Sequence, residues 1–326
     1  MWVLYKMLYV VLRQLMIKVH KDLSHLPKFK NAVITIGTFD GVHTGHQQII
    51  QLLKKEATAI GGETVIITFY PHPRKVIHDG KKEIFVLNTL EEKIELLNKQ
   101  EVEHLVVIPF DENFALQSAG TYVEDFLVAK FHPKTIIIGY DHKFGKNRSG
   151  DYHLLEKLGE KFNYKVREIP GHMQNEITVS STRIREALQT CRILDANILL
   201  GYNYFFEGNV IKGNQLGRTI GYPTANIKIE DNEKLIPGNG VYAVRVKIEN
   251  DTTIYNGMMN IGIRPTLNGE STTTEVNLFN FSGDIYNKKI KVYIVNFIRT
   301  EVKFNNLEEL KKQLFKDEET AYKLLA

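Results

Sequence analysis

The chain has 326 residues, 43% of them hydrophobic and 25% charged, which is ordinary for a globular protein and at this length predicts two domains. The net charge of +4 is spread along the sequence and forms no clustered basic face of the kind that nucleic-acid-binding proteins use. The lone Cys191 excludes an intramolecular disulfide and a multi-cysteine zinc site and fits a reducing cytoplasm, where we expect the protein. From the spread charge we expect no nucleic-acid partner, and we expect no membrane partner either. Homo-oligomer formation stays open.

The first fifteen residues are apolar but interrupted by Lys6 and Arg13. This segment is too short to span a bilayer and lacks a small-residue cleavage site, so we do not expect a signal peptide. We interpret Met16 as the natural start of the protein. The alternative is an amphipathic helix that rests on the body of the protein.

From Ala32 to about Leu188, short apolar runs alternate with amphipathic stretches. The expected strands are Ala32–Ile36, Thr64–Phe69, His104–Pro109, Thr135–Gly139 and Tyr164–Ile169. The expected helices are His46–Ile60, Leu90–Lys99, Tyr122–Phe131 and Tyr152–Phe162. Continuous apolar strands separated by helices predict a doubly wound, Rossmann-like parallel sheet of the α/β class. Ligands of such sheets bind at the carboxyl ends of the strands.

After about Thr190 the pattern changes to strands in which polar residues alternate with β-branched or aromatic ones. These strands are Phe205–Val210, Gly240–Ile248, Thr253–Ile261, Thr273–Phe279 and Lys289–Phe297. They predict an all-β domain, a small antiparallel barrel or sandwich, on which a final helix, Leu307–Leu325, would pack. We therefore expect domains at 16–188 and 204–326, joined by a linker at 189–203.

The first motif is the run Gly37–His46, GTFDGVHTGH, between the first strand and its helix. Its glycines allow the backbone to come close to a ligand, and the free amides at the helix N-terminus favour phosphate. His43 and His46 can face one bound group and stabilise charge that develops at the α-phosphate of a nucleoside triphosphate. A metal pair or helix-capping histidines are the alternative. We predict catalytic roles for both histidines and phosphate contacts for Gly37, Phe39, Asp40 and Gly45, although Asp40 equally suits a turn-stabilising role.

A second phosphate element follows the last strand of the α/β domain, in the run Ser180–Arg185, SSTRIR. Ser180 or Ser181 can cap a helix there, which leaves backbone amides, a hydroxyl group and two guanidinium groups for phosphates. As an isolated string the run would only be a capped helix. Its position after the last strand predicts that it shares the sheet edge of His46. The predicted phosphate contacts are Ser180, Ser181, Thr182 and Arg185.

Glycines punctuate the run that leads to Pro223–Asn226, PTAN, in the second half of the chain. Successive amides in such a loop can form an anion-binding concavity, so we predict phosphate contacts for Gly213, Gly217 and Gly221. Thr224 and Asn226 would project on one side of an extended segment, where their oxygens suit Mg²⁺. An ordinary strand is the alternative.

Glu275 is the only acid in its expected strand. A positioned carboxylate can take the proton of an alcohol that attacks a γ-phosphate, so Glu275 is a candidate catalytic base. The alternative is a surface glutamate paired with a lysine. Arg299 either binds substrate or forms a surface ion pair.

Four stretches of the first half resemble the adenylyltransferase module of bacterial bifunctional riboflavin kinase/FMN adenylyltransferases. They are Gly37–His46, Thr68–Arg74 (TFYPHPR), Gly139–Gly145 (GYDHKFG) and Ser180–Arg185. The resemblance continues through the second half, where Asn260–Thr266 (NIGIRPT) is also similar. One departure is His142, where that family more often has an aromatic residue such as Phe.

The resemblance implies that His43, His46, Ser181 and Arg185 contact the phosphates of ATP. It also places Asp141 and the Phe69–Pro73 loop near adenine or flavin, so that the implied flavin- or nucleotide-binding residues are Phe69, Pro71, Pro73, Asp141 and Arg299. In the second half, Thr224 and Asn226 are similar to the ligands of magnesium and phosphate, and Glu275 is similar to the catalytic base.

The function that the resemblance implies is the phosphorylation of riboflavin to FMN by ATP, followed by the adenylylation of FMN to FAD with release of pyrophosphate. Two other functions are weighed against it. A related nucleotidyltransferase acting on a pantetheine or pyridine nucleotide phosphate would explain the histidines but would leave the Pro223–Asn226 run and Glu275 without a role. A non-catalytic β domain that grips nucleic acid would need interleaved basic and aromatic residues, which the sequence lacks.

Overall fold

The computed structural model describes residues 16–77, 84–139, 142–169, 179–213, 216–266 and 269–326, so the predictions for 1–15 and Asp141 lie outside the described residues. The chain divides into two compact units, Met1–Val179 and Ser180–Ala326. The division falls just before α9 (Ser181–Gln189), and the segment 189–203 that was expected to be a linker contains α10 (Ile193–Leu200).

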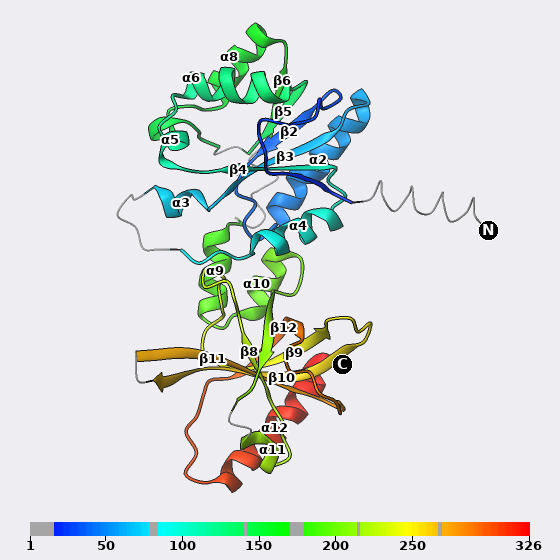
Figure 1. Cartoon of the computed structure of the whole chain (residues 1–326), viewed down its shortest axis with the longest axis vertical. Helices are drawn as coiled ribbons and strands as arrows, with labels where there is room; N and C mark the ends of the chain where they lie inside the picture. Colours follow the sequence, from blue (N-terminus) through cyan, green and yellow to red (C-terminus); the bar gives the residue numbers. More distant parts are fainter. Residues whose placement is uncertain (1–15, 78–83, 140–141, 170–178, 214–215, 267–268) are drawn as a thin grey trace, which may run out of the picture. The chain divides into compact units, whose positions relative to one another are not determined.

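A six-stranded parallel sheet forms the centre of the first unit and confirms the predicted doubly wound α/β class. The strand order is β1-β4-β3-β2-β5-β6 (Figure 1). The strand bounds are β1 (Lys18–His20), β2 (Val33–Ile36), β3 (Thr64–Tyr70), β4 (His104–Pro109), β5 (Thr135–Ile138) and β6 (Lys165–Glu168). Strand β1 was not predicted, because three residues are too few for a periodic signal.

Every residue of β2 and β5 is buried, so both faces of this sheet are covered, as the helices between the strands predict. The helical bounds are α2 (Thr44–Ile60), α3 (Pro73–Val76), α4 (Leu90–Lys99), α5 (Glu112–Ala115), α6 (Ala119–Thr121), the π-helical η1 (Tyr122–Val128), α7 (Ala129–Phe131), the short 3₁₀ turn η2 (Lys146–Arg148) and α8 (Tyr152–Phe162). The single helix expected at Tyr122–Phe131 is thus a π-helical turn followed by a short α-helix. The wider turn buries four of its side chains, Tyr122, Val123, Phe126 and Leu127.

The second unit is built on a closed antiparallel barrel, which decides between the two predicted β architectures. Its strands are β7 (Phe205–Ile211), β8 (Ala225–Lys228), β9 (Gly240–Ile248), β10 (Ile254–Thr266), β11 (Gly269–Leu278) and β12 (Lys289–Arg299). Around the barrel they follow the order β10-β11-β8-β7-β12-β9. A four-residue helix, α11 (Leu216–Thr219), precedes the short strand β8, which lies in the extended segment predicted after Pro223.

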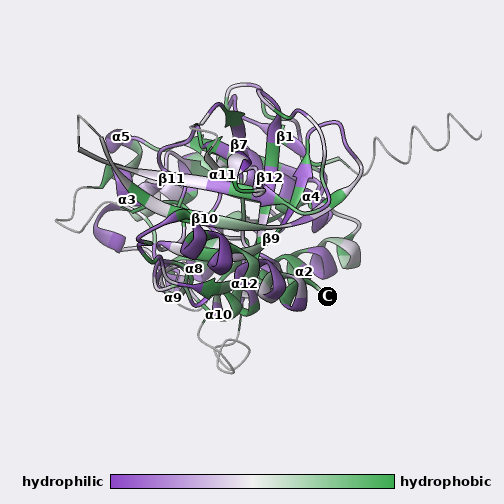
Figure 2. Cartoon of the chain, turned by 90° about the horizontal axis from the view of Figure 1, so that it is seen from below, coloured by the Kyte–Doolittle hydropathy of each residue, from purple (hydrophilic) through white to green (hydrophobic). Residues whose placement is uncertain are grey.

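The final helix, α12 (Leu307–Leu325), has the predicted bounds and packs on the barrel. Its Ala321 and Leu325 side chains lie against Met258 and Phe279, and Figure 2 shows hydrophilic and hydrophobic residues alternating along it. Among the described residues, every helix is too short or too polar to cross a lipid bilayer.

Candidate functional sites

The histidine motif lies at the point where the strand order of the parallel sheet reverses. Strand β2 has β3 and β4 on one side and β5 and β6 on the other. The turn 37–43 leaves the carboxyl end of β2, and its first amide, that of Gly37, donates to the Ile67 carbonyl of β3 at 3.0 Å. Ligands of doubly wound sheets bind in the crevice at this switch point.

The two imidazole rings of His43 and His46 are stacked, with centroids 3.7 Å apart and an interplanar angle of 14°. His43 is the N-cap of α2, and its Nδ1 accepts a hydrogen bond from the His46 amide at 3.3 Å. The Phe39 ring lies 4.8 Å from the His46 ring. The capping role that was weighed as an alternative is therefore real for His43, and it brings the second imidazole against the first.

His46 holds a buried polar nitrogen, because its Nδ1 is shielded from solvent and has no hydrogen-bond partner among the described residues. Burial lowers the pKa of His46 well below its ordinary value, and the nearby His43 and Lys93 lower it further. The imidazole is therefore neutral at pH 7, where it can both donate and accept a hydrogen bond. At a helix N-terminus, a neutral imidazole can donate a hydrogen bond to a phosphate oxygen without carrying a charge itself.

Asp40 has the structural role that was considered for it. Its side chain is only 1% exposed and accepts hydrogen bonds from the amides of Leu87, at 2.9 Å, and Asn88, at 3.3 Å. A carboxylate with backbone donors on a neighbouring segment stabilises the turn that carries it. Gly45 leaves room for the imidazole, because a Cβ there would lie 3.3 Å from the His43 ring.

In the predicted flavin loop, the half-buried Phe69 packs against the hydrophobic core. The Phe69 ring lies 5.4 Å from the Phe110 ring and 5.8 Å from the Phe114 ring. Pro71 is exposed, and Pro73 begins the short helix α3 after its N-cap His72. Tyr70, in the same loop, is also exposed, so of the loop's two aromatic residues only Phe69 packs against the core.

Ser180 caps a helix as predicted, because its hydroxyl group accepts a hydrogen bond from the Arg183 amide at 3.3 Å. The helix is α9 and starts the second compact unit, whereas His43 and His46 belong to the first. Phosphate contacts by Ser181, Thr182 and Arg185 beside the histidines therefore stay a prediction.

In the barrel, strand pairing brings together three of the predicted residues. Glu275 of β11 is the cross-strand partner of Asn226 on β8 and of Asn260 on β10. The hydroxyl group of Thr224 donates to Glu275 Oε2 at 3.3 Å. Directly opposite residues in antiparallel strands point to the same face, so a carboxylate, a hydroxyl group and two amides gather at one place.

The glycine loop lies directly against this cluster. A Cβ at Gly213 would overlap the side-chain amide of Asn226, so only glycine fits at this close approach. The Gly217 carbonyl accepts from the Tyr222 amide at 2.8 Å, and Gly221 has a φ of +87°, which favours glycine. The loop therefore needs these glycines for its turn and its close approach.

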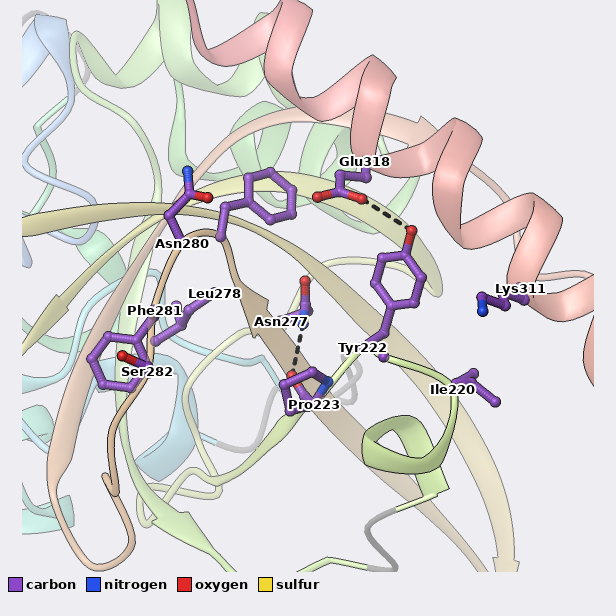
Figure 3. A pocket seen from close by; sticks show the side chains of 12 residues that line it. Ile220, Tyr222, Pro223, Asn277, Leu278, Asn280, Phe281, Ser282, Lys311 and Glu318 are labelled. Atoms are coloured by element: carbon purple, nitrogen blue, oxygen red, sulfur yellow. Dashed lines mark hydrogen bonds between the residues drawn. The ribbon is translucent and has the colours of Figure 1, made fainter.

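A pocket of about 560 Å³ adjoins the cluster (Figure 3). Asn277 lies two residues after Glu275 on β11, and its amide donates to the Pro223 carbonyl at 2.7 Å. The Tyr222 hydroxyl group donates to Glu318 of α12 at 3.0 Å, and burial together with Glu318 raises the pKa of Tyr222 to about 12. The other lining residues are Ile220, Gly221, Leu278, Phe279, Asn280, Phe281, Ser282 and Lys311. Of the lining residues, the sequence analysis had singled out only Gly221 and Pro223, because the lining comes from three separate segments.

The guanidinium group of Arg299 faces helix α12. Its Nε and Nη2 donate to the Asp317 carboxylate at 2.9 and 2.7 Å, and its Nη1 donates to the Thr300 carbonyl at 2.9 Å. Asp317 is 1% exposed, and Gln313 also donates to it. Arg299 thus forms an ion pair with a buried carboxylate and not a pair at the surface, and the flavin contact implied by the resemblance stays a prediction.

Replacing Arg299 with Met is expected to lower the free energy of unfolding of the barrel by about 3–5 kcal/mol, because it leaves a buried carboxylate without its ion-pair partner. The KM for riboflavin of the folded fraction should not change. Urea unfolding and steady-state kinetics measure the two effects. The double variant Arg299→Met/Asp317→Leu should recover most of the lost stability. A raised KM for riboflavin at unchanged stability would instead support the flavin contact that the resemblance implies for Arg299.

Two family models match the chain: the FAD synthetase model over residues 26–183 and the riboflavin kinase model over residues 200–325. The chain is similar to known bifunctional riboflavin kinase/FMN adenylyltransferases. That of Haemophilus influenzae is 40% identical, over 90% of this chain and 94% of the relative. The enzyme of Escherichia coli K12 is 35% identical, over 92% and 94% of the two chains, and that of Listeria monocytogenes is 37% identical, over 89% and 91%.

A solved structure described as a macrolide-efflux protein from Streptococcus pneumoniae has the same fold, with a TM-score of 0.84 and 30% identity over 94% of this chain and 99% of that one. The two matched models lie in the order in which the sheet unit and the barrel unit follow each other. Since the relatives match over nearly their whole length, the chain belongs to the family of bifunctional riboflavin kinase/FMN adenylyltransferases.

Proposed function

We propose that the chain makes FMN in its barrel unit and FAD in its sheet unit, with ATP as the second substrate of both reactions. The observation that carries the proposal is that one chain holds two separate clusters of polar side chains of the kinds that suit phosphate. One is the stacked His43–His46 pair at the switch point of the sheet, and the other is Thr224, Asn226 and Glu275 in the barrel.

In the kinase reaction, Glu275 accepts the proton of the 5′-hydroxyl group of riboflavin while that oxygen attacks the γ-phosphate of ATP, giving FMN and ADP. The position of Glu275 supports this role, because its carboxylate lies beside Thr224 and opposite Asn226. Catalysis of phosphoryl transfer depends mostly on positioning and on neutralising charge, so no covalent enzyme intermediate is needed.

The oxygens of Thr224 and Asn226 fit Mg²⁺, which prefers hard oxygen ligands and takes the rest of its shell from water and substrate phosphates. Among the described residues, no group of three or more His, Cys, Asp or Glu side chains could hold a metal ion. When bound, Mg²⁺ would neutralise charge on the phosphate oxygens. Thr224 and Asn226 would keep their oxygens turned toward it, beside Glu275.

The pocket beside the cluster is the proposed place for the adenosine of ATP. Gly221 and Pro223 line it, and they belong to the loop that we assign to the phosphates. The aromatic rings of Tyr222, Phe279 and Phe281 line it as well. Aromatic side chains favour contact with a flat base.

In the adenylylation, a phosphate oxygen of FMN attacks the α-phosphate of ATP, and the bond to pyrophosphate breaks. The two imidazoles and the N-terminal amides of α2 stabilise the charge on the α-phosphate and on the leaving pyrophosphate. Ser181 and Arg185 are proposed as further phosphate contacts, and Pro71, Pro73 and Asp141 as flavin or adenine contacts. A cytoplasmic location is proposed from the single cysteine of the chain.

Incubation of the purified chain with riboflavin, ATP and magnesium, followed by chromatographic separation of the flavins, tests the proposal. FMN should appear first and FAD later, with ADP and pyrophosphate as the other products. Supplied FMN should give FAD without added riboflavin. A folded sample that converts riboflavin to neither nucleotide would refute the proposal, and adenylylation of 4′-phosphopantetheine instead of FMN would favour the alternative nucleotidyltransferase.

A further inference from the structure

A buried lysine lies in the first unit at a position that its helix would ordinarily fill with an apolar residue. Leu90, Lys93 and Leu97 share the inner face of α4 and are 8%, 7% and 0% exposed. Burying an ammonium group is costly unless other groups hold it by hydrogen bonds or charge. The contacts of Lys93 therefore indicate why it is there.

The Lys93 ammonium group contacts the turn that carries the histidine pair. Its Nζ donates to the Thr38 carbonyl at 2.7 Å and lies 3.5 Å from the Thr68 hydroxyl group, which itself donates to the Thr38 carbonyl at 3.1 Å. Thr38 lies between Gly37 and Phe39, in the middle of the turn. Two donors from α4 and β3 thus converge on one carbonyl oxygen of this turn.

A second attachment holds the same turn to the chain just before α4. The Asp40 carboxylate accepts from the amides of Leu87 and Asn88. Helix α4 begins two residues later, after a capping box formed by Thr89 and Glu92. The turn is thus held at Thr38 by α4 and β3 and at Asp40 by the segment that leads into α4.

Lys93 interacts electrostatically with Asp40 and with His46. Burial lowers the pKa of Lys93, and the negative charge of Asp40 opposes this effect and favours the ammonium form. The positive charge of Lys93, like that of His43, lowers the pKa of His46. Lys93 does not need to touch substrate to act, since its charge reaches the imidazole through the interior of the protein.

We propose that Lys93 is a positioning residue for adenylyl transfer, which holds the turn of the histidine motif through the Thr38 carbonyl and adds positive charge to the surroundings of His46. The inference rests on the proposed role of the histidine pair. A positive charge at this place favours the neutral imidazole, which keeps His46 from protonating as the pH falls. It also adds favourable charge near a bound triphosphate without occupying the site.

The test uses the full chain with Lys93→Met, which keeps the length of the side chain and removes the charge. Lys93→Arg keeps the charge, and Lys99→Met serves as the matched control, because Lys99 is an exposed residue of the same helix that pairs with Glu95. Three quantities are measured: kcat/KM for FAD formation from supplied FMN across pH 5–8, riboflavin kinase activity, and the titration of the His46 imidazole by NMR.

For Lys93→Met we expect kcat/KM for FAD formation to fall on the order of 10²-fold, as for a small displacement of a catalytic group. The acid limb of the pH profile and the His46 titration should both move to higher pH, since a like charge has been removed. Lys93→Arg should return the acid limb toward its wild-type position. Kinase activity and Lys99→Met should stay at the wild-type level.

A purely structural lysine would lower activity without moving either the acid limb or the His46 titration, and that result would overturn the proposal. If Lys93→Met does not fold, Lys93→Gln takes its place, because it keeps a donor for the Thr38 carbonyl and removes the charge; an acid limb and a His46 titration that both stay at their wild-type positions would overturn the proposal. Failure of the wild-type chain to make FAD would refute the proposed function, whereas normal wild-type FAD formation with an unaffected Lys93→Met variant would refute only the role of Lys93.

Discussion

Replacement of His46 with Ala is expected to abolish FAD formation from supplied FMN, with a fall in kcat on the order of 10³-fold, while riboflavin phosphorylation survives. The reason is that the His46 ring is stacked at 3.7 Å on His43 at the N-terminus of α2, where charge on the α-phosphate would develop. The kinase cluster lies in a different compact unit. Separate assays of the two reactions on the same preparation measure this split.

The matched control is His153→Ala, which removes an exposed histidine of α8 in the same unit and should change neither reaction. Far-ultraviolet circular dichroism and an unchanged melting temperature show that the variant is folded. Equal loss of both activities in a folded His46→Ala protein would contradict two independent sites. Full retention of FAD formation would show that His46 has no catalytic part.

The second large effect is expected for Glu275→Gln, which should reduce FMN formation by about 10²- to 10⁴-fold and leave FAD formation from supplied FMN intact. The amide keeps the size of the side chain but cannot take the proton of the riboflavin hydroxyl group. Since the Thr224 hydroxyl group can still donate to an amide oxygen, the local structure should persist. Discontinuous chromatographic assays of each reaction provide the measurement.

Glu308→Gln is the control for the barrel unit, because Glu308 is an exposed acid in the first turn of α12 and lies outside the proposed site. It should leave both rates at the wild-type level. If Glu275→Gln phosphorylated riboflavin at the normal rate, the assignment of Glu275 as general base would be wrong. If it lost both activities while folded, the separation of the two sites would be wrong instead.

Local sequence patterns predicted the bounds of several elements correctly. The helices Leu90–Lys99, Tyr152–Phe162 and Leu307–Leu325 and the strands His104–Pro109 and Gly240–Ile248 all have the predicted ends. Their signals are complete within the segment itself, as in the capping box of Thr89 and Glu92. The very short strand β1 lacked such a signal and was found only in the structure, and the bounds of the extended segment that forms β8 were also set only there.

The tertiary structure alone decided how distant residues meet. Asn226 and Glu275 are far apart in the sequence, and only the register of β8 against β11 makes them neighbours. The sequence left two roles open for Arg299, and only the structure shows that it pairs with the buried Asp317 on another element. Strand register depends on pairing partners that no local pattern contains.

The sequence by itself determined the class of each half, the place of the histidine motif after the first predicted strand, and the family that the chain resembles. These follow from residue types and spacings within short stretches. The structure decided the closed barrel, the pocket formed by three separate segments, and the burial of Lys93 beneath the histidine turn. Each of these depends on which surfaces come together, because burial and cross-strand contact are properties of pairs of segments and not of a single one.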